Sequence, residues 1–447
     1  MIDNQIKKDP RQIKRLIPLR ANSEELLSDI AKQHKYILDN NNEVSLQDVY
    51  HLCSAFKHEH PIRCVIKAHS SEDYCAKLND LINGKNHKEI FISNTKHEIP
   101  ARVVFVYSGM GPQWWGMGRD LYKHYDVFKT VIDKCENLIN KCAGWSLLNE
   151  MFRPEDSSNM SQTWLAQPAN FALQAGLTEL WKTWGVTPNC VVGHSIGETT
   201  AFYVAGVHTF EEALLINLHR GRLQHKLIGQ GKMLAVGLNE FEIRSYIHNE
   251  DQVRLAAINS NSSVTLAGEE SCLHKIFEAL PDNIFKKYLT VNIPYHGHCM
   301  EQIKAELEYE LSSIRFAKGN HIKLYSSVTG KSWNENLSPV QYWWKNTFDT
   351  VHFKSVSEDI IRNGNNIFVE IGPHKALLPS LKETATNFSS PCCFMSSLNK
   401  GTNEIETLQK SLSSIFCSGV NVNWEKYNKD LSDAMLIVDK INYQTPN

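Results

Sequence analysis

Short apolar runs alternate along most of this chain with longer stretches that carry apolar residues at helical spacing. Two of the runs, residues 103–107 and 367–371, are continuous and rich in β-branched or aromatic side chains, which is typical of strands buried on both faces. Between them, stretches with helical spacing separate further short runs, among them residues 189–192. This order predicts a parallel sheet that is covered by helices on both faces.

Two further units accompany this pattern. Before residue 98, strand-like runs alternate with helical patterns, and Ser23 followed by two glutamates is typical of a helix N-cap, so we expect a small α/β domain there. Between residues 232 and 296 the runs follow a strand–helix–strand–strand–helix–strand order, which predicts a ferredoxin-like subdomain. Its predicted strands are residues 233–238, 253–258, 263–267 and 288–291, and its predicted helices are residues 241–248 and 272–280.

The composition describes a globular chain without a strong electrostatic bias. Its 447 residues include 47 Lys and Arg against 49 Asp and Glu, and the formal net charge of −2 gives no reason to expect nucleic acid or an anionic membrane as a partner. The 11 cysteines lack a C-x-x-C pair or a Cys/His array with zinc spacing, so we expect free thiols, a reducing cytoplasmic setting and no metal. Residues 1–15 lack the apolar core of a signal peptide, and no uncharged apolar stretch is long enough to span a bilayer.

The run Gly193-His194-Ser195-Ile196-Gly197 fits the nucleophile-elbow pattern G-x-S-x-G. An apolar, β-branched run precedes it and helix-forming residues follow, which predicts a sharp turn from a strand into a helix. Such a turn lifts the serine Oγ clear of the backbone and places the next backbone N–H, that of Ile196, where an oxyanion would form. Ser195 is therefore a candidate nucleophile for acyl transfer or acyl hydrolysis. The fold class that follows is α/β, with an α/β-hydrolase-like parallel-sheet core.

A serine nucleophile needs a base, and 19 histidines compete for that role. His296 and His298 follow the last predicted strand of the small subdomain, at a junction where clefts often form, and either could be the base. The glycine-rich loop 108–118 lacks the spacing of a phosphate-binding loop, so we interpret it as backbone that approaches the substrate, with a donor at Gln113. Arg220 lies late in a predicted helix and could bind a carboxylate through two hydrogen bonds if it points into the cleft.

In combination, these features resemble the malonyl-CoA:acyl-carrier-protein acyltransferase domain of polyketide synthases and animal-type fatty acid synthases. The motifs that carry the resemblance occur in order: Gly109-Met110-Gly111-Pro112-Gln113, Gln167-Pro168-Ala169, Gly193-His194-Ser195-Ile196-Gly197-Glu198, Arg220-Gly221, Tyr295-His296, Tyr342-Trp343-Trp344-Lys345-Asn346 and Glu370-Ile371-Gly372-Pro373-His374. The resemblance implies that the chain is an excised portion of a large synthase, with a ketosynthase as its neighbour. It implies four parts: a ketosynthase-to-acyltransferase linker domain at 1–98, the large subdomain at 99–231 and 297–392, the small subdomain at 232–296, and the start of a following linker at 393–447.

The resemblance also implies a ping-pong mechanism. Ser195 attacks the thioester of an acyl-CoA, His296 takes and returns the proton, and the acyl group passes to the phosphopantetheine thiol of an acyl carrier protein. The backbone N–H groups of Gln113 and Ile196 form the oxyanion hole. A backbone carbonyl, in place of the acid of a catalytic triad, orients the imidazole of His296, and the position that matches it is Asn346. No bound cofactor is expected, since acyl-CoA is the donor substrate.

The substrate class follows from the same resemblance. Arg220 pairs with the free carboxylate of a dicarboxylic acyl group, and Gln167 and His194 contact the substrate. The bulky Tyr295 before the histidine, together with Ile196 after the serine, favours malonyl over methylmalonyl. A methyl group shifts selectivity by only about 1–3 kcal/mol, so a methylmalonyl-selective enzyme is the alternative.

Two other classes of protein could carry the same turn. A serine thioesterase or lipase would use an acid-supported histidine near the end of the chain and would not need Arg220. His374 is the comparable late histidine, and we interpret it as structural. An inactive scaffold that only docks neighbouring domains would not need Ser195, His296 and Arg220 together.

Overall fold

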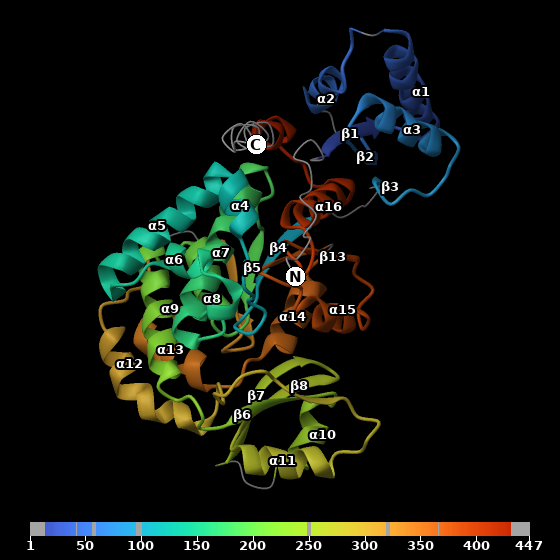
Figure 1. Cartoon of the computed structure of the whole chain (residues 1–447). Helices are drawn as coiled ribbons and strands as arrows, with labels where there is room; N and C mark the ends of the chain where they lie inside the picture. The colour runs from blue at the N-terminus through green and yellow to red at the C-terminus, as the bar shows by residue number, and fades with distance from the viewer. Residues whose placement is uncertain are drawn as a thin grey trace.

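The computed structural model describes residues 14–41, 43–55, 60–94, 101–247, 252–318, 322–364 and 366–430. The described strands form a three-stranded sheet, a six-stranded sheet and a four-stranded sheet. The six-stranded sheet is central, and the other two lie at opposite ends of the molecule (Figure 1). None of the described helices combines the length and the apolar character needed to cross a bilayer.

The N-terminal unit is an antiparallel sheet of order β1-β2-β3 with helices on it. Its elements are β1 (Arg15–Ala21), α1 (Glu24–Asn40), α2 (Leu46–Ala55), β2 (Ile62–Ala68), α3 (Ser71–Ile82) and β3 (Ile90–Asn94). Ser23 and Ser70 cap α1 and α3, because each hydroxyl accepts a hydrogen bond from a backbone N–H of the first turn. The predicted cap at Ser23 is therefore confirmed.

The central sheet has the order β11-β10-β5-β4-β12-β13, and its strands are parallel except β11 at the edge. The strands are β4 (Arg102–Tyr107), β5 (Cys190–Gly193), β10 (Lys323–Ser326), β11 (Lys331–Ser332), β12 (Asn366–Ile371) and β13 (Cys392–Ser396). Phe105 and Tyr107 of β4 belong to one apolar cluster, whereas Val104 and Val106 belong to another, so both faces of the sheet are covered. The predicted parallel-sheet core is confirmed.

Helices connect the central strands. They are α4 (Arg119–His124), α5 (Asp126–Ala143), α6 (Leu147–Phe152), α7 (Thr163–Thr183), α8 (Gly197–Ala205), α9 (Phe210–His225), α12 (Lys304–Glu310), α13 (Pro339–Phe348), α14 (Phe353–Arg362) and α15 (Leu378–Ala385), with short 3₁₀ turns η2 (Glu155–Ser157) and η3 (His298–Ile303). Because β4 and β5 are parallel neighbours, the loops that follow them meet at one edge of the sheet. These two loops hold the glycine-rich segment and Ser195.

The four-stranded sheet is antiparallel, in the order β7-β8-β6-β9. Its elements are β6 (Lys232–Val236), α10 (Glu240–Arg244), β7 (Val253–Ser260), β8 (Ser263–Gly268), α11 (Glu270–Ala279) and β9 (Lys286–Tyr288). Most predicted boundaries shift by one or two residues: β6 ends at Val236 rather than 238, for example, and α11 covers Glu270–Ala279 rather than 272–280. Two elements differ more. The predicted helix 241–248 ends at Arg244, with residue 248 outside the described residues, and the predicted strand 288–291 begins and ends earlier because only residues 286–288 pair with β6.

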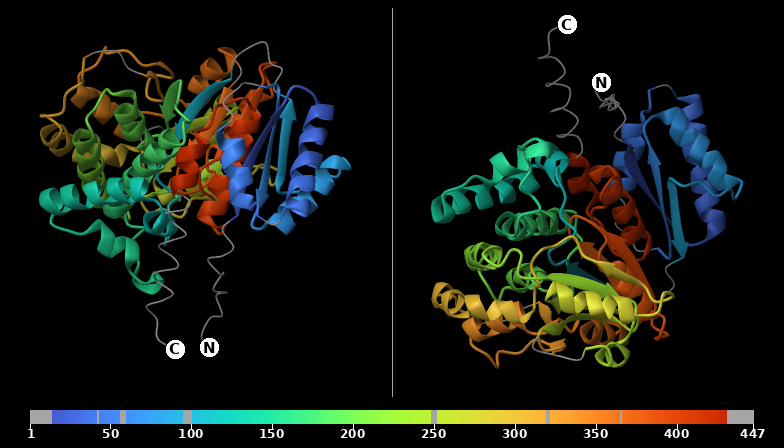
Figure 2. Two further views of the ribbon diagram at one scale, coloured as in Figure 1. Left: turned by 90° about the horizontal axis from the view of Figure 1, so that it is seen from above. Right: turned by 60° about the horizontal axis from the view of Figure 1, so that its bottom comes forward.

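Helix α16 (Glu404–Cys417) and the segment after it join the N-terminal unit to the central sheet. Figure 2 shows the N-terminal unit in blue beside the red C-terminal helix in both views. Arg63 of β2 donates to the Val420 carbonyl at 2.9 Å, and the hydroxyl of Tyr50 in α2 donates to the Trp424 carbonyl at 2.5 Å. The C-terminal segment thus holds residues from the two ends of the described chain together.

Candidate active site

The predicted nucleophile elbow lies between β5 and α8. Ser195 has φ = 51°, in the left-handed region that non-glycine residues rarely adopt. The flanking glycines are required by space: a Cβ on Gly193 would lie 2.3 Å from Glu198 N, and one on Gly197 would lie 2.4 Å from Tyr107 O. The G-x-S-x-G pattern therefore reflects a turn that leaves no room for a side chain at either glycine position.

His296 is the histidine that reaches the serine. Its Nε2 lies 2.8 Å from Ser195 Oγ, and its Nδ1 donates to the backbone carbonyl of Asp349 at 2.9 Å. Because a carbonyl only accepts, Nδ1 carries the proton of the neutral ring and Nε2 is free to accept the serine proton. Burial, with the nearby Arg220 guanidinium, lowers the pKa of His296 to about 3, so the ring is neutral at pH 7.

The other candidate base, His298, faces elsewhere. Its ring lies edge-on to that of Phe348, with 6.1 Å between the ring centroids. His296 has φ = 63°, and among the described residues Ser195 and His296 are the non-glycine residues with positive φ. Backbone strain is thus concentrated on the two residues whose side chains face each other, as is common where a fold holds reacting groups.

The residue that orients His296 is Asp349, not Asn346 as the resemblance implied. Asn346 lies one turn earlier in α13, and its side-chain amide donates to Ser195 O at 3.0 Å and to Glu198 Oε2 at 2.8 Å. Asp349 is the C-cap of α13, where a carbonyl has no partner within the helix and can accept from outside. A backbone carbonyl does stand in place of an acid, but three residues further along the chain.

Arg220 of α9 is buried beside the serine. It is 2 % exposed, and its Nη2 donates to Ser195 Oγ at 3.1 Å and to Asn346 O at 3.4 Å. Its Nε and Nη1 have no hydrogen-bond partner among the described residues. Burial lowers the pKa of Arg220 to about 10, which leaves the guanidinium charged at pH 7. A buried cation beside Ser195, with two nitrogens that have no partner among the described residues, is suited to bind a carboxylate.

The two other predicted substrate contacts lie on both sides of this centre. Gln167 of α7 donates from Nε2 to Gln224 Oε1 at 2.6 Å, and its own Oε1 is buried without a partner among the described residues. His194 Nε2 lies 2.9 Å from Oδ1 of Asn259, which belongs to β7 of the four-stranded sheet. The small sheet therefore contacts the residue next to Ser195.

Tyr295 is held in place by a hydroxyl on α7. Its hydroxyl and Thr163 Oγ1 lie 2.6 Å apart, and both side chains are buried. The Thr163 carbonyl also lies against the helix turn after Arg220, because a Cβ on Gly221 would be 3.0 Å from it. Tyr295 therefore has a fixed position close to the guanidinium.

The loop after β4 passes beside the nucleophile. A Cβ on Gly109 would lie 3.6 Å from Ser195 Cβ, and the side-chain oxygen of Gln113 accepts from Gly111 N at 2.6 Å. This bond closes the loop on itself between Gly111 and Gln113. The assignment of the backbone N–H groups of Gln113 and Ile196 as an oxyanion hole remains a prediction.

The sequence interpretation missed three residues of this centre. Glu198 is part of the elbow motif but was given no role, Asp349 acts through its backbone, and Asn259 lies on the small sheet. Only Glu198 carried a usable signal, namely a carboxylate in the first turn of a helix whose other residues are apolar or small.

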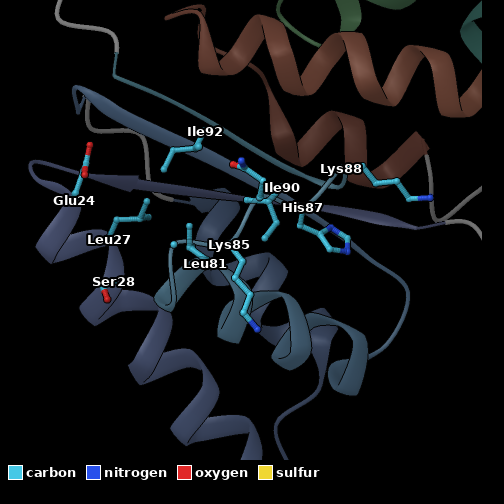
Figure 3. A pocket seen from close by; sticks show the side chains of 11 residues that line it. Glu24, Leu27, Ser28, Leu81, Lys85, His87, Lys88, Ile90 and Ile92 are labelled. Atoms are coloured by element: carbon cyan, nitrogen blue, oxygen red, sulfur yellow. The ribbon is translucent and has the colours of Figure 1, made fainter.

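A hollow of about 480 Å³ lies in the N-terminal unit, between α1, the end of α3 and β3, and its floor is formed by aliphatic side chains (Figure 3). Ser28 and His87 both line it, but no hydrogen bond among the described residues joins them, and His87 Nδ1 accepts instead from Glu89 N at 3.1 Å. In the described part of the chain, no group of three or more His, Cys, Asp or Glu side chains could hold a metal ion.

Comparison with known proteins gives one consistent result. Residues 104–422 match the acyl transferase domain family. The chain is 31% identical over 374 residues to the highly reducing polyketide synthase sdnO of Sordaria araneosa, and 31% identical over 377 residues to probable polyketide synthase 1 of Dictyostelium discoideum. These alignments cover 78% and 80% of this chain but only 12% of each relative, so the chain spans about an eighth of their length.

A solved structure agrees with these relatives. The acyltransferase domain from module 8 of the salinomycin polyketide synthase is 26% identical and superposes with a TM-score of 0.84, over 92% of this chain and 98% of that domain. The superposition includes the parallel-sheet core. The chain belongs to the acyl transferase domain family, and its relatives are polyketide synthases.

Proposed function

We propose that this chain loads a malonyl extender unit from malonyl-CoA onto Ser195 and then onto the phosphopantetheine thiol of an acyl carrier protein. The observation that carries the proposal is Arg220, a buried guanidinium that touches Ser195 Oγ and has two nitrogens without partners. A buried guanidinium that forms no direct ion pair with a described residue favours a substrate that brings its own counter-ion. The carboxylate of a malonyl group is such a counter-ion, and a neutral acyl chain is not.

The steps follow from the atoms in the site. Ser195 Oγ attacks the thioester carbonyl while its proton passes to His296 Nε2. The backbone N–H groups of Gln113 and Ile196 stabilise the oxyanion, and His296 returns the proton to the departing CoA sulfur. The carrier thiol then attacks the acyl-serine in the same way, which regenerates Ser195.

The surrounding parts fit a portion of a synthase. We infer a linker domain at residues 1–98 next to a ketosynthase, a large subdomain at 99–231 and from 297 through β13, and a following linker after β13. The predicted boundary at 392/393 is wrong, because Cys392–Ser396 form β13 and pair with β12 of the central sheet. The small subdomain at 232–296 is ferredoxin-like, since its strand order β7-β8-β6-β9 is the one expected for that fold. The relatives, of which this chain matches about an eighth, support the inference that the chain is a portion of a synthase.

Intact-protein mass measurement tests the proposal. The chain is mixed briefly with malonyl-CoA, methylmalonyl-CoA and acetyl-CoA in competition, and a phosphopantetheinylated carrier protein is then added. We expect a malonyl adduct that disappears as the carrier gains the same mass. A dominant methylmalonyl adduct would overturn the malonyl assignment but keep the mechanism. Steady CoA release without any adduct or transfer would instead indicate a hydrolase.

The anchor of Tyr295 gives a specificity prediction. Thr163→Val removes the hydroxyl partner of Tyr295 while it keeps the side-chain volume, so the ring can turn away and leave room for a 2-methyl group. We expect the preference for malonyl-CoA over methylmalonyl-CoA to fall about tenfold. Thr163→Ser keeps the hydroxyl and should retain the preference. An unchanged ratio of kcat/KM values in Thr163→Val would show that Tyr295 does not limit the acyl pocket.

A further inference from the structure

Glu198 is a fully buried carboxylate three residues after the nucleophile. Its Oε1 accepts hydrogen bonds from the backbone N–H and the hydroxyl of Ser327, the latter at 3.0 Å. Its Oε2 accepts from the Tyr342 hydroxyl and from Asn346 Nδ2, both at 2.8 Å. The donors come from α13 and from the turn after β10, so one side chain of α8 binds two separate segments to the elbow.

The end of α13 carries much of the catalytic geometry. Asn346 donates from its side chain to Ser195 O at 3.0 Å and accepts from Arg220 Nη2 at its backbone carbonyl at 3.4 Å. Three residues later, the Asp349 carbonyl holds His296 Nδ1. A shift of α13 relative to α8 would therefore move the serine backbone, the guanidinium and the imidazole relative to one another.

Other buried carboxylates of this chain do something different. Glu370 accepts from the backbone N–H groups of Ala376, Leu377 and Leu378, at the start of α15. Burial raises the pKa of Glu370 to about 7, as it does for Glu198. The two residues thus share burial and charge, but the partners of Glu370 are helix N–H groups, whereas Asn346 links Glu198 to Ser195 and Arg220.

We propose that Glu198 is a positioning residue for acyl transfer: its carboxylate holds the C-terminal end of α13 against the nucleophile elbow, so that the Asp349 carbonyl keeps His296 aimed at Ser195. This inference rests on the proposed function of the same site. Glu198 also supplies a buried negative charge near Arg220, whose guanidinium it helps to keep ionised.

The test compares Glu198→Gln with the matched variant Glu370→Gln. A glutamine at position 198 can turn one oxygen to Ser327 or to Asn346 but not to both, because its amide nitrogen would then face another donor. We expect the single-turnover rate of Ser195 acylation at saturating malonyl-CoA to fall about tenfold to hundredfold in Glu198→Gln. The half-saturating malonyl-CoA concentration should not rise, since Arg220 keeps its free donors. Glu370→Gln should leave the rate within about twofold, because it changes no contact of Ser195.

A pH profile separates positioning from general destabilisation. The titratable groups that face Glu198 are the Tyr342 hydroxyl of α13 and the Arg220 guanidinium of α9. When the pH falls below about 7, Glu198 gains a proton and loses an acceptor for Asn346, so the wild-type rate should fall. This fall in rate at acidic pH, the acid limb of the profile, should be absent in Glu198→Gln and present in Glu370→Gln. His296, whose pKa is lowered to about 3, does not produce it.

Two further measurements keep the outcome decisive. Tyr342→Phe removes one donor to Glu198 without a charge change and should move the acid limb to higher pH, which matters if Glu198→Gln does not fold. A fluorophosphonate probe labels an activated serine whatever the acyl substrate, and its rate should also fall in Glu198→Gln. If the probe labels Glu198→Gln more slowly than the wild type, but the wild type forms no malonyl adduct, only the proposed function would be overturned. The role of Glu198 would be overturned if the rate is unchanged in Glu198→Gln or falls equally in Glu370→Gln. It would also be overturned if the acid limb remains in Glu198→Gln or does not move in Tyr342→Phe.

Discussion

Replacing Ser195 with alanine should abolish acyl transfer, with a loss on the order of a million-fold, as expected when a covalent nucleophile is removed. The loss follows from the geometry, because Ser195 Oγ is the atom that both His296 Nε2 and Arg220 Nη2 approach, at 2.8 and 3.1 Å. Alanine can adopt the φ of 51° at about the same cost as serine, so the fold should persist. Intact-protein mass after incubation with malonyl-CoA gives the readout, and an adduct that survives in Ser195→Ala would place the nucleophile elsewhere.

The base is tested by a pair of neighbouring histidines. His296→Ala should slow acylation of Ser195 by about 10²–10⁴-fold, the usual contribution of a positioned general base. His298→Ala is the matched control, because its ring contacts Phe348 and not the serine, and it should acylate at close to the wild-type rate. A greater loss in His298→Ala than in His296→Ala would reverse the assignment.

The turn at Ser195 could be predicted because its constraint is local. A Cβ at Gly193 or Gly197 would lie only 2.3 to 2.4 Å from a backbone atom, so the turn admits only glycine at these positions. The residue types therefore indicate the backbone geometry directly. The same holds for the buried strand at residues 103–107, whose two faces meet different apolar clusters. Where packing or space fixes the residue type, the sequence carries the information.

The orientation of His296 could not be predicted in the same way. Any residue can present a backbone carbonyl, so Asp349 carries no signal in its side chain, and the resemblance placed the role at Asn346 instead. The contact also joins segments 53 residues apart, which no local pattern records. For Glu198 the difficulty was the opposite. Its residue type was visible in the sequence, but its role depends on Asn346 of α13, which is 148 residues further along the chain.

In the function proposed above, Arg220 is the residue that distinguishes a transferase for dicarboxylic acyl groups from a general serine esterase. Arg220→Ala removes the buried cation that the substrate carboxylate would meet, so that carboxylate would be desolvated without a partner. We expect kcat/KM for malonyl-CoA to fall hundredfold or more, which corresponds to a loss of about 3 kcal/mol of transition-state stabilisation. Acetyl-CoA, which brings no charge, should lose far less and become the preferred donor in competition.

The neighbouring Arg222 provides the control for this change. It is exposed and pairs with Glu306 and Glu310 at 3.0 and 2.8 Å, so Arg222→Ala removes one guanidinium from the same helix without touching Ser195. It should leave the malonyl preference intact, because an exposed pair contributes at most about 1 kcal/mol. If Arg220→Ala kept its preference for malonyl-CoA over acetyl-CoA, the guanidinium would act only on the position of Ser195, and the extender carboxylate would need another partner. If both donors lost activity equally, the same conclusion would follow, since a carboxylate clamp must discriminate between them.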